Sequence, residues 1–537
     1  MERVQVNPIV SGFAPDPSLI CVDGIYFLVN STFHLFPGLP IYASADLKKW
    51  KHIGNAFNRT SQLDIQQSYT KLWAPPGMNE QFPCEGGLYA PTIRHHKGTF
   101  YIICTNVQHP RENPITKNVY QNFILSTNDI WANDWSDPVF FDFHGIDTSL
   151  FWDDDDRVYV VGSASPADPS PMATIHQFEI DLKTGRKLSE EKLLWEGITK
   201  VFPEGPHTYK KDGWYYLLIA EGGCFAGHHS IMARSRDIWG PYEVNPANPV
   251  LKKADANGYF QYTSHGDLFQ GPSGQWYFCC LGVRKTKEGR FIMGRETFLT
   301  TAQWPEGEYP VIDPVGLDVP LPDQNSLSLP EFPVPANSPS FTPELDLIHI
   351  RRPADGHYQY ENGSITLTAS KEGLNQPYEP VTFVGKRQRL LTGTASATLT
   401  AGTIGSDSAN GSSLQAGLCY YKDELRFSQI FLDMGSREIV WQIFNKAKSM
   451  DHRSRRSAEE FLAAGPSAKM VFGISYTEAD IEFWYVTKIN GKESDKTVLG
   501  KIDTLDLTAH EFVGPVVGIF ATGEEGTHLL FNDFHVQ

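Results

Sequence analysis

The first half of the chain alternates short apolar runs with tight turns, and five of these runs share one pattern. The copies are Asp16-Pro-Ser-Leu…Gly24-Ile-Tyr-Phe, Ala90-Pro-Thr-Ile…Gly98-Thr-Phe-Tyr, Asp147-Thr-Ser-Leu…Asp156-Arg-Val-Tyr, Glu204-Gly-Pro-His…Gly213-Trp-Tyr-Tyr and His265-Gly-Asp-Leu…Gly274-Gln-Trp-Tyr. Each copy predicts a short strand, a tight turn and a second, aromatic strand. The turns lie at 24, 98, 156, 213 and 274, so successive gaps are 74, 58, 57 and 61 residues. Self-similarity of short strands on this scale indicates a β-propeller, and five copies predict five blades.

One polar position recurs within the repeat. Eight or nine residues before each turn, the chain carries Asp16, Ala90, Asp147, Glu204 and His265. The innermost strand of each propeller blade lines the central channel, so equivalent positions face one another across it. We therefore expect three carboxylates and a histidine to converge on one axis.

A second pattern is a blade turn that the chain uses three times. Ser44–Trp50, Ser126–Trp131 and Ser235–Trp239 each follow a strand-like run and carry Ser, Asp or Asn, which supply turn hydrogen bonds. Strands such as Tyr101-Ile-Ile-Cys are nearly all apolar, as expected of strands buried between neighbouring blades. The adjacent Cys279 and Cys280 would point to opposite faces of one strand.

The repeat stops near residue 320, and the chain changes character there. Seven prolines between Pro320 and Pro343 predict an extended linker over residues 321–343. Beyond it, alternating segments such as Ser364–Ala369 and Glu438–Phe444 predict an antiparallel β-sandwich over residues 344–537, with a short helix near 457–464. The predicted fold class is all-β: a five-bladed β-propeller over residues 1–320, followed by a β-sandwich domain.

Composition narrows the classes of partner. The formal net charge of −17 disfavours nucleic acid and anionic membrane surfaces, and it suits a neutral substrate. Seven irregularly spaced cysteines do not describe a disulfide framework. The opening Met-Glu-Arg-Val-Gln-Val-Asn-Pro has no apolar stretch, and no run approaches a membrane span, so we expect a cytoplasmic protein. Secretion stays open if a signal peptide was removed, because sequons occur at Asn30, Asn58, Asn362 and Asn410. Assembly into a homo-oligomer also stays open.

The converging carboxylates have the residue types that glycosidic bond cleavage needs. One group must protonate the leaving oxygen, and a carboxylate must activate water or attack the sugar. Glu204 lies in the apolar segment Val-Phe-Pro-Glu-Gly-Pro, which would raise its pKa and make it the proton donor. Asp147, on the adjacent blade, would raise that pKa further and orient the donor. Asp16, held between two prolines, suits the base, and its place across the channel from Glu204 predicts inversion. Taken singly, an Asp in Pro-Asp-Pro is more often a turn residue.

The motifs together resemble one enzyme family. Asn7-Pro-Ile-Val-Ser-Gly-Phe-Ala-Pro-Asp-Pro-Ser18 resembles the opening of glycoside hydrolase family 43. Ser31–Gly38, Gly87–Pro91, Asp147–Phe151, Glu204–His207 and Gly294–Thr297 follow in the family's order and resemble its β-xylosidase branch. The resemblance implies a five-bladed propeller with a C-terminal β-sandwich. It also implies inverting hydrolysis of xylosides or arabinofuranosides, with Asp16 as base, Glu204 as acid and Asp147 as modulator.

The resemblance implies roles for further residues. Arg295 would reach a substrate hydroxyl; the alternative role for this residue is a structural salt bridge. Phe33 and Tyr89 would line the terminal sugar subsite. Tyr89 and Ile146 stand where the xylosidases carry Trp and Phe, so both alter the pocket wall. Phe512, in Glu511-Phe-Val-Gly-Pro, resembles a residue of the sandwich domain that reaches into the pocket. The alternative role for Phe512 is a position in the core of the sandwich. His265 would sit near the axis, where it would hydrogen-bond within the site or help to hold a calcium ion. No cofactor is otherwise required.

Several features call for simpler interpretations. The acidic run Asp153–Asp156 falls at a blade turn, which favours a solvated loop over a calcium site. The pairs His95–His96 and His228–His229 lack metal-ligand spacing and are predicted to be surface or packing residues. Residues 64–85 precede the second inner strand and would shape the mouth of the channel.

The leading hypothesis is an exo-acting β-xylosidase or α-L-arabinofuranosidase acting on oligosaccharides of xylan or arabinoxylan. The alternatives are a non-catalytic carbohydrate-binding propeller and an endo-arabinanase.

Overall fold

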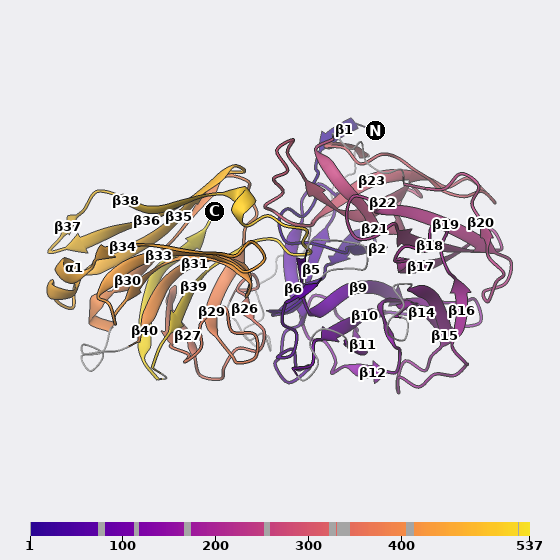
Figure 1. Ribbon diagram of the computed structural model, residues 1–537. Coiled ribbons are helices and arrows are strands. Elements are labelled where there is room, and N and C mark those ends of the chain that lie inside the picture. The colour runs from indigo at the N-terminus through magenta and orange to yellow at the C-terminus, as the bar shows by residue number, and fades with distance from the viewer. Residues whose placement is uncertain are drawn as a thin grey trace.

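A computed structural model describes residues 2–73, 81–111, 118–165, 173–251, 258–321, 329, 344–403, 413–524 and 526–537. The chain folds into two bodies that lie side by side, one formed before residue 321 and one after residue 344 (Figure 1). Nearly all regular structure is β-strand, and the single α-helix of the described residues is α1, Glu459–Ala463. The all-β prediction and the short helix are therefore confirmed. The linker predicted over 321–343 lies, apart from Leu321 and Leu329, outside the described residues.

The first body contains five four-stranded antiparallel sheets, each made of consecutive strands. They are β2(Ser18–Val22)-β3(Ile25–Val29)-β5(Gly38–Ser44)-β6(Lys51–Phe57), β9(Gly87–His96)-β10(Thr99–Gln108)-β11(Val119–Thr127)-β12(Val139–Phe141), β13(Gly145–Trp152)-β14(Val158–Ala164)-β15(Thr174–Glu179)-β16(Lys192–Trp195), β17(Glu204–Lys211)-β18(Trp214–Glu221)-β19(His229–Ser235)-β20(Glu243–Val244) and β21(Phe260–Gln270)-β22(Trp276–Arg284)-β23(Glu296–Gln303)-β24(Val311–Ile312).

The first strands of the five sheets contact one another in a closed ring. β2 contacts β9, β9 contacts β13, β13 contacts β17, β17 contacts β21, and β21 returns to β2. β1(Glu2–Gln5) pairs with β25(Asp318–Leu321) and ties the two ends of this body together. Five four-stranded sheets with contacting first strands are what a five-bladed propeller contains, so the topology supports that interpretation. We call this body the five-sheet domain.

Each sheet of the five-sheet domain is covered on both faces, which explains its continuous apolar strands. Cys279 and Cys280 are neighbours on β22, and both are fully buried. Cys279 belongs to the apolar core that contains Tyr26 of β3, whereas Cys280 belongs to the core that contains Tyr216 of β18. The two cysteines point to opposite faces, as predicted, and each face packs against a different neighbouring sheet.

The reused turn connects the third and fourth strands of three sheets. In the first sheet, Ser44 Oγ accepts from the Leu47 N–H, and Asp46 Oδ1 accepts from the Lys48 N–H. Asp129 Oδ1 accepts from the Trp131 N–H in the second sheet, and Asp237 Oδ1 accepts from the Trp239 N–H in the fourth. The Ser and Asp side chains therefore satisfy backbone donors of the turn, as the sequence predicts.

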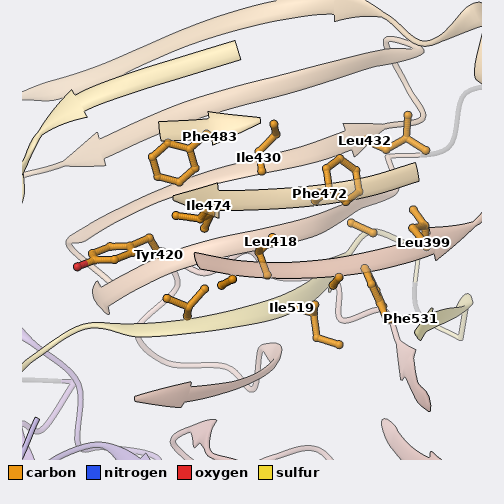
Figure 2. Close-up of a cluster of buried hydrophobic side chains, with 14 of the residues drawn as sticks. Leu399, Leu418, Tyr420, Ile430, Leu432, Phe472, Ile474, Phe483, Ile519 and Phe531 are labelled. Atoms are coloured by element: carbon orange, nitrogen blue, oxygen red, sulfur yellow. The ribbon is translucent and has the colours of Figure 1, made fainter. Parts of the chain in front are cut away.

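The second body is a β-sandwich of two antiparallel sheets, which confirms the prediction for this half of the chain. One sheet has the order β27(Tyr358–Glu361)-β28(Ser364–Thr368)-β40(His528–Val536)-β30(Gly393–Thr400)-β35(Lys469–Tyr476)-β36(Asp480–Ile489)-β37(Lys492–Glu493), with β38(Thr497–Asp503) also paired to β36; the other has the order β29(Thr382–Arg387)-β39(Val516–Thr522)-β31(Gln415–Asp423)-β32(Arg426–Asp433)-β33(Glu438–Asn445)-β34(Met450–Ser457). Figure 2 shows the apolar layer between them, where Leu418 and Ile430 of one sheet face Phe472 and Ile474 of the other.

A buried network of charges joins the sandwich to the five-sheet domain. β32 begins at Arg426, whose guanidinium contacts Asp423 at 2.6 Å, Glu511 at 2.5 Å and Glu85 at 3.3 Å. Lys422 Nζ lies 2.9 Å from Glu511 Oε1, and all five side chains are fully buried. Glu85 belongs to the segment that precedes β9, so the network crosses from one domain to the other. We call these five residues the interdomain ion cluster.

Two further contacts hold the segment before β9 against the sandwich. The Thr70 N–H donates to Glu424 Oε1 at 2.7 Å, and its hydroxyl donates to Glu424 Oε2 at 2.8 Å. β7(Lys71–Trp73) pairs with β8(Phe82–Cys84) in the same segment, whose residues 74–80 lie outside the described part of the chain. β4(Leu35–Phe36) pairs with β26(His349–Ile350), which adds a backbone link between the domains. Among the described residues, no helix has the length and apolarity needed to cross a lipid bilayer.

Candidate active site

Four of the five repeat positions share an unusual backbone conformation at the centre of the ring. Asp16, Ala90, Asp147 and His265 all have positive φ, at 48°, 32°, 56° and 43°. In the fourth copy, the residue with positive φ is Gly205, at 57°, and not Glu204. The pairing of the first two strands is also irregular at four of these places, between Ile103 and Thr105, Ile146 and Ser149, Glu204 and His207, and Ser264 and Gly266. Bulges of this kind redirect side chains and are common beside active sites.

The predicted equivalence of Glu204 with the other four positions is therefore wrong by one residue. Gly205 is followed by Pro206, as Asp16 is by Pro17 and Ala90 by Pro91. Asp16, Ala90, Asp147, Gly205 and His265 line one small cavity with Pro17, Pro91, Thr92 and His207, and the cavity has room for roughly one water molecule. Glu204 instead occupies the position of Tyr89 and Ile146, one residue before the axis.

His265 lies between the two axial carboxylates. Its Nδ1 is 3.8 Å from Asp16 Oδ1, and its Nε2 is 4.0 Å from Asp147 Oδ2. All three side chains are buried. Each ring nitrogen therefore faces one acidic group, and the imidazole fixes the separation of Asp16 and Asp147.

Asp16 is held from two further directions. The Ser31 hydroxyl donates to Asp16 Oδ2 at 2.6 Å, and the Ala90 N–H donates to Ser31 Oγ at 2.6 Å. Arg295 Nη1 lies 3.4 Å from Asp16 Oδ1. Asp16 therefore has a hydroxyl donor at one carboxyl oxygen and a guanidinium beside the other.

The pKa of the Asp147 carboxyl group is raised above its ordinary value. Burial raises its pKa to about 7, and the neighbouring carboxylates of Glu204 and Asp16 add to the rise, while His265 opposes it. The Gly205 N–H donates to Asp147 Oδ2 at 3.1 Å. Because Gly205 follows Glu204 in the chain, this hydrogen bond couples Asp147 to the backbone that carries Glu204.

Glu204 has a different environment from the one that its sequence predicts. Burial alone would raise its pKa, but His228, then His265 and Arg295, outweigh burial and lower the pKa below its ordinary value. His228 Nε2 lies 3.3 Å from Glu204 Oε1. The Cys224 thiol lies 3.8 Å from Glu204 Oε2. The raised pKa predicted for Glu204 is therefore wrong, because three basic groups surround this carboxyl group.

Arg295 joins the acidic residues to an aromatic wall. Its Nη2 donates to the Cys224 carbonyl at 2.9 Å, and its guanidinium lies 4.4 Å from the centre of the Phe512 ring. Phe33 and Phe225 lie on either side of Phe512, each with its ring centre 5.9 Å away and nearly parallel to it. Phe512 comes from the loop between β38 and β39, so the sandwich supplies part of this wall.

Tyr89, Phe82 and Ile146 complete the aromatic wall or lie beside it. Tyr89 contacts Phe33 edge-on at 4.9 Å, and its hydroxyl donates to the Glu85 carbonyl. Phe82 of β8 contacts Phe225 at 5.2 Å and Phe512 at 6.2 Å. Ile146 is half-buried at the matching position before Asp147. The segment before β9 therefore reaches the wall through Phe82, at the site where the sequence predicts a mouth.

Sequence reasoning missed four residues of the site: His228, Cys224, Phe225 and Phe82. His228, for which the sequence predicts a surface or packing role, is fully buried, and it also lies 3.3 Å from the carboxyl group of Glu204. For His95 and His96 the prediction is confirmed, because they pack on Phe100 and Trp152. The acidic run is also a surface loop, as predicted: Lys210 pairs with Asp153, Arg157 with Asp155 and Lys97 with Asp156.

A calcium ion does not have an evident cage here. Calcium takes six to eight oxygen ligands. Within the described ranges, no group of three or more His, Cys, Asp or Glu side chains is arranged to hold a metal ion. Both nitrogens of His265 face carboxylates, so we do not assign this residue as a metal ligand and derive no step from a metal.

Comparison with known proteins gives matches along the whole chain. Residues 5–310 match the family model described as glycosyl hydrolases family 43, and residues 340–537 match the beta xylosidase C-terminal concanavalin A-like domain. The non-reducing end alpha-L-arabinofuranosidase BoGH43B of Bacteroides ovatus is 30% identical over 527 residues, covering 96% of this chain and 91% of its own length. The xylosidase/arabinosidase 43B of Humicola insolens is 36% identical over 307 residues, covering 56% and 54%.

Solved structures agree with these matches. The xylan beta-1,4-xylosidase from Bacillus halodurans C-125 superposes with a TM-score of 0.82 at 26% identity, covering 98% of this chain and 99% of that one. The Bacteroides ovatus xyloglucan PUL GH43B superposes with a TM-score of 0.81 at 28% identity over the whole of both chains. With both halves of the chain matched and the acidic site in place, this protein belongs to glycosyl hydrolase family 43.

Proposed function

We propose that this glycoside hydrolase removes single xylose or arabinose residues from the non-reducing ends of oligosaccharides derived from xylan or arabinoxylan. The observation that carries the proposal is the grouping of Asp16, Asp147, Glu204 and Arg295 beside an aromatic wall. Carboxyl groups supply the acid and base, a guanidinium binds sugar hydroxyls, and aromatic rings pack on sugar faces.

The roles of the three carboxyl groups follow from their surroundings. Asp16, with hydroxyl and guanidinium neighbours, is the base that takes a proton from the attacking water. Glu204 is the acid that protonates the leaving oxygen. Asp147 acts on Glu204 through the Gly205 N–H and through its own charge. Attack by water on the face opposite the leaving group inverts the anomeric centre.

The location of Phe512 favours an exo-acting enzyme over an endo-arabinanase. An endo-acting enzyme needs a groove that is open at both ends. Here the sandwich brings Phe512 against Phe33 and over Arg295, and it reaches Phe82 of the segment before β9. Side chains from both domains therefore enclose the site on this side, as a pocket for a chain end requires.

The sugar preference depends on the wall at Tyr89 and Ile146. The relative that matches nearly the full chain is named an arabinofuranosidase, and relatives that match the five-sheet domain are named xylosidase/arabinosidase. Because Tyr89 and Ile146 are smaller than the Trp and Phe of the resembling xylosidases, we expect this wall to admit a furanose as well as a pyranose.

Hydrolysis of nitrophenyl β-xyloside and nitrophenyl α-L-arabinofuranoside tests this function. We expect turnover of at least one of these two substrates. Proton NMR should show that the sugar is released with its anomeric configuration inverted. The internal glycosidic bonds of linear arabinan should not be cleaved. Binding of oligosaccharides without hydrolysis would instead support the non-catalytic carbohydrate-binding alternative. A retained anomer would exclude Asp16 as the base.

A further inference from the structure

The loop between β22 and β23 carries Arg295, and it reaches from the five-sheet domain into the sandwich. Ile292 and Met293 of this loop are fully buried, and both belong to the apolar core of the sandwich, together with residues such as Leu418. Arg295 ends the loop, because β23 begins at the next residue. The position of the Arg295 guanidinium therefore depends on how this loop packs in the sandwich.

The loop that carries Phe512 lies directly against the loop that carries Arg295. A Cβ atom added at Gly294 would lie only 2.0 Å from the carbonyl oxygen of Val513, so the two backbones leave no room for a side chain between them. Gly294 directly precedes Arg295 in the chain, and Val513 directly follows Phe512. The packing of these two backbones therefore constrains the distance of 4.4 Å between the guanidinium and the Phe512 ring.

One buried side chain, Lys422 of β31, contacts both loops. Its Nζ donates to the carbonyl oxygen of Ile292 at 2.9 Å, and it lies 2.9 Å from Glu511 Oε1. Ile292 stands three residues before Arg295, and Glu511 stands next to Phe512. The Lys422 side chain is fully buried, and a buried ammonium group is costly unless it is paired. A single ammonium group therefore holds the two loops in one arrangement.

Arg426 acts on the same carboxylate from its other side. Its Nη1 donates to Glu511 Oε2 at 2.5 Å, so each oxygen of Glu511 has a cation beside it. Arg426 also contacts Glu85, whose carbonyl oxygen accepts from the Tyr89 hydroxyl. The interdomain ion cluster therefore reaches the pocket in two places. Arg426 connects it to Tyr89, and Lys422 connects it to the loop that carries Arg295.

We propose that Lys422 is a positioning residue of the active site, which fixes the Arg295 guanidinium over the Phe512 ring and thereby sets how tightly the terminal sugar is bound. The inference rests on the proposed function, in which both of these side chains bind that sugar. It deepens that function by assigning a role in sugar binding to a buried residue of the sandwich.

The contacts of the carboxyl groups indicate which kinetic constant Lys422 affects. The Ser31 hydroxyl donates to Asp16, and the Gly205 N–H donates to Asp147. These contacts are made within the five-sheet domain and do not involve the sandwich. Loss of Lys422 should therefore weaken the binding of the sugar more than it slows cleavage of the glycosidic bond.

Lys422→Met tests the proposal, because it keeps an unbranched side chain and removes the ammonium group. With the nitrophenyl glycoside that the wild type hydrolyses, we expect KM to rise about ten-fold and kcat to change by less than about three-fold. The inhibition constant of the free sugar product should rise by the same factor as KM. In a Phe512→Ala background, Lys422→Met should raise KM by less than about three-fold, since Lys422 acts through the ring that this background lacks.

A second variant separates positioning from charge balance in the interdomain ion cluster. Lys422→Met alone leaves a surplus of negative charge in a buried place, which is destabilising. Lys422→Met combined with Glu511→Gln removes one charge of each sign and still breaks the ion pair between the two loops. We expect the combined variant to unfold at a higher temperature than Lys422→Met and to keep the raised KM.

Arg389→Met is the matched control. Arg389 follows β29 in the sandwich and likewise donates across the domain boundary, to the Ser11 carbonyl at 2.7 Å and to the Tyr42 hydroxyl at 2.6 Å. Neither partner belongs to the acidic group or to the aromatic wall, so this variant should unfold at a lower temperature with KM unchanged.

The outcomes separate this inference from the function on which it rests. An unchanged KM in both Lys422 variants, or an equal rise in Arg389→Met, would overturn the positioning role and leave Lys422 as a structural link between the domains. A wild type that hydrolyses neither nitrophenyl glycoside would instead overturn the proposed function.

Discussion

The ring of His265 occupies the space that a side chain on Gly205 would need. A Cβ atom at Gly205 would lie 2.7 Å from His265 Cδ2 and 2.8 Å from Nε2. Gly205 also has φ of +57°, a left-handed backbone conformation that favours glycine over residues with a side chain. The absence of a side chain at the fourth axial position is therefore what lets the imidazole lie between Asp16 and Asp147.

Gly205→Ala should displace His265 and disturb both carboxylates. We expect kcat to fall roughly 10- to 100-fold, because misplacement by about 1 Å has effects of this size. Gly98→Ala is the control, since Gly98 has φ of +82° and nothing within 4 Å of an added Cβ. It should cost about 1 kcal/mol of stability with unchanged kcat. Steady-state kinetics and thermal unfolding of both variants check this; equal kcat values would contradict it.

Asp16→Ala should abolish useful turnover on every glycoside. The base is needed whatever the leaving group, so kcat should fall by about 10²- to 10⁴-fold on nitrophenyl and sugar substrates alike. Asp155→Ala, in the surface loop where Asp155 pairs with Arg157, should change nothing. A variant of Asp16 that retained full activity on nitrophenyl glycosides would remove it from the base role.

Glu204→Ala should discriminate between leaving groups. Loss of the acid should reduce hydrolysis of oligosaccharides by about 10²- to 10⁴-fold, whereas nitrophenyl glycosides should keep most of their rate. A series of aryl glycosides of graded leaving-group acidity measures the dependence directly. Equal loss across the series would show that Glu204 does not donate the proton.

The raised pKa of Asp147 should make the free energy of unfolding fall as the pH rises. Its pKa is 3.8 when unperturbed and about 7 in the folded protein, so the folded state binds the proton more tightly. The contribution is fully present below the unfolded value and is lost as pH rises through the folded one. Between pH 4 and pH 7, the wild type should therefore lose on the order of a few kcal/mol relative to Asp147→Asn. Urea unfolding across this range checks the slope, and parallel curves for the two proteins would exclude the raised pKa.

Phe512→Ala should weaken substrate binding more than it slows chemistry. The change removes the ring under the Arg295 guanidinium and opens the wall shared with Phe33. We expect KM to rise about ten-fold, equivalent to about 1.4 kcal/mol, with a smaller change in kcat. Phe444→Ala, which removes a sandwich ring packed on Phe427, should leave KM unaltered. A rise in KM for both variants would indicate a general effect of the sandwich.

The axial residues were predictable because the repeat places them. Asp16, Asp147 and His265 occupy equivalent points of one supersecondary unit, and a closed ring of such units brings equivalent points together. The error at Glu204 arose from aligning the carboxylates. Aligning Pro206 with Pro17 and Pro91 would have identified Gly205 as the axial residue.

Other parts of the site have no local signal. The place of His228 in the site depends on Tyr262 and Glu204, which lie on different sheets, so no spacing along the chain marks it. The lowered pKa of Glu204 likewise depends on basic groups that approach from separate elements. The apolar residues beside Glu204 in sequence say little about its electrostatic surroundings in the fold.

The interdomain ion cluster limits how this enzyme can be recombined with others. Arg426 satisfies acidic groups of its own domain and Glu85 of the other, with no exposure to water. A gene fusion that supplied a foreign sandwich would leave Glu85 buried without its cation, which is strongly destabilising. The two halves therefore have to be inherited, exchanged or engineered as one unit, even though each has a fold of its own.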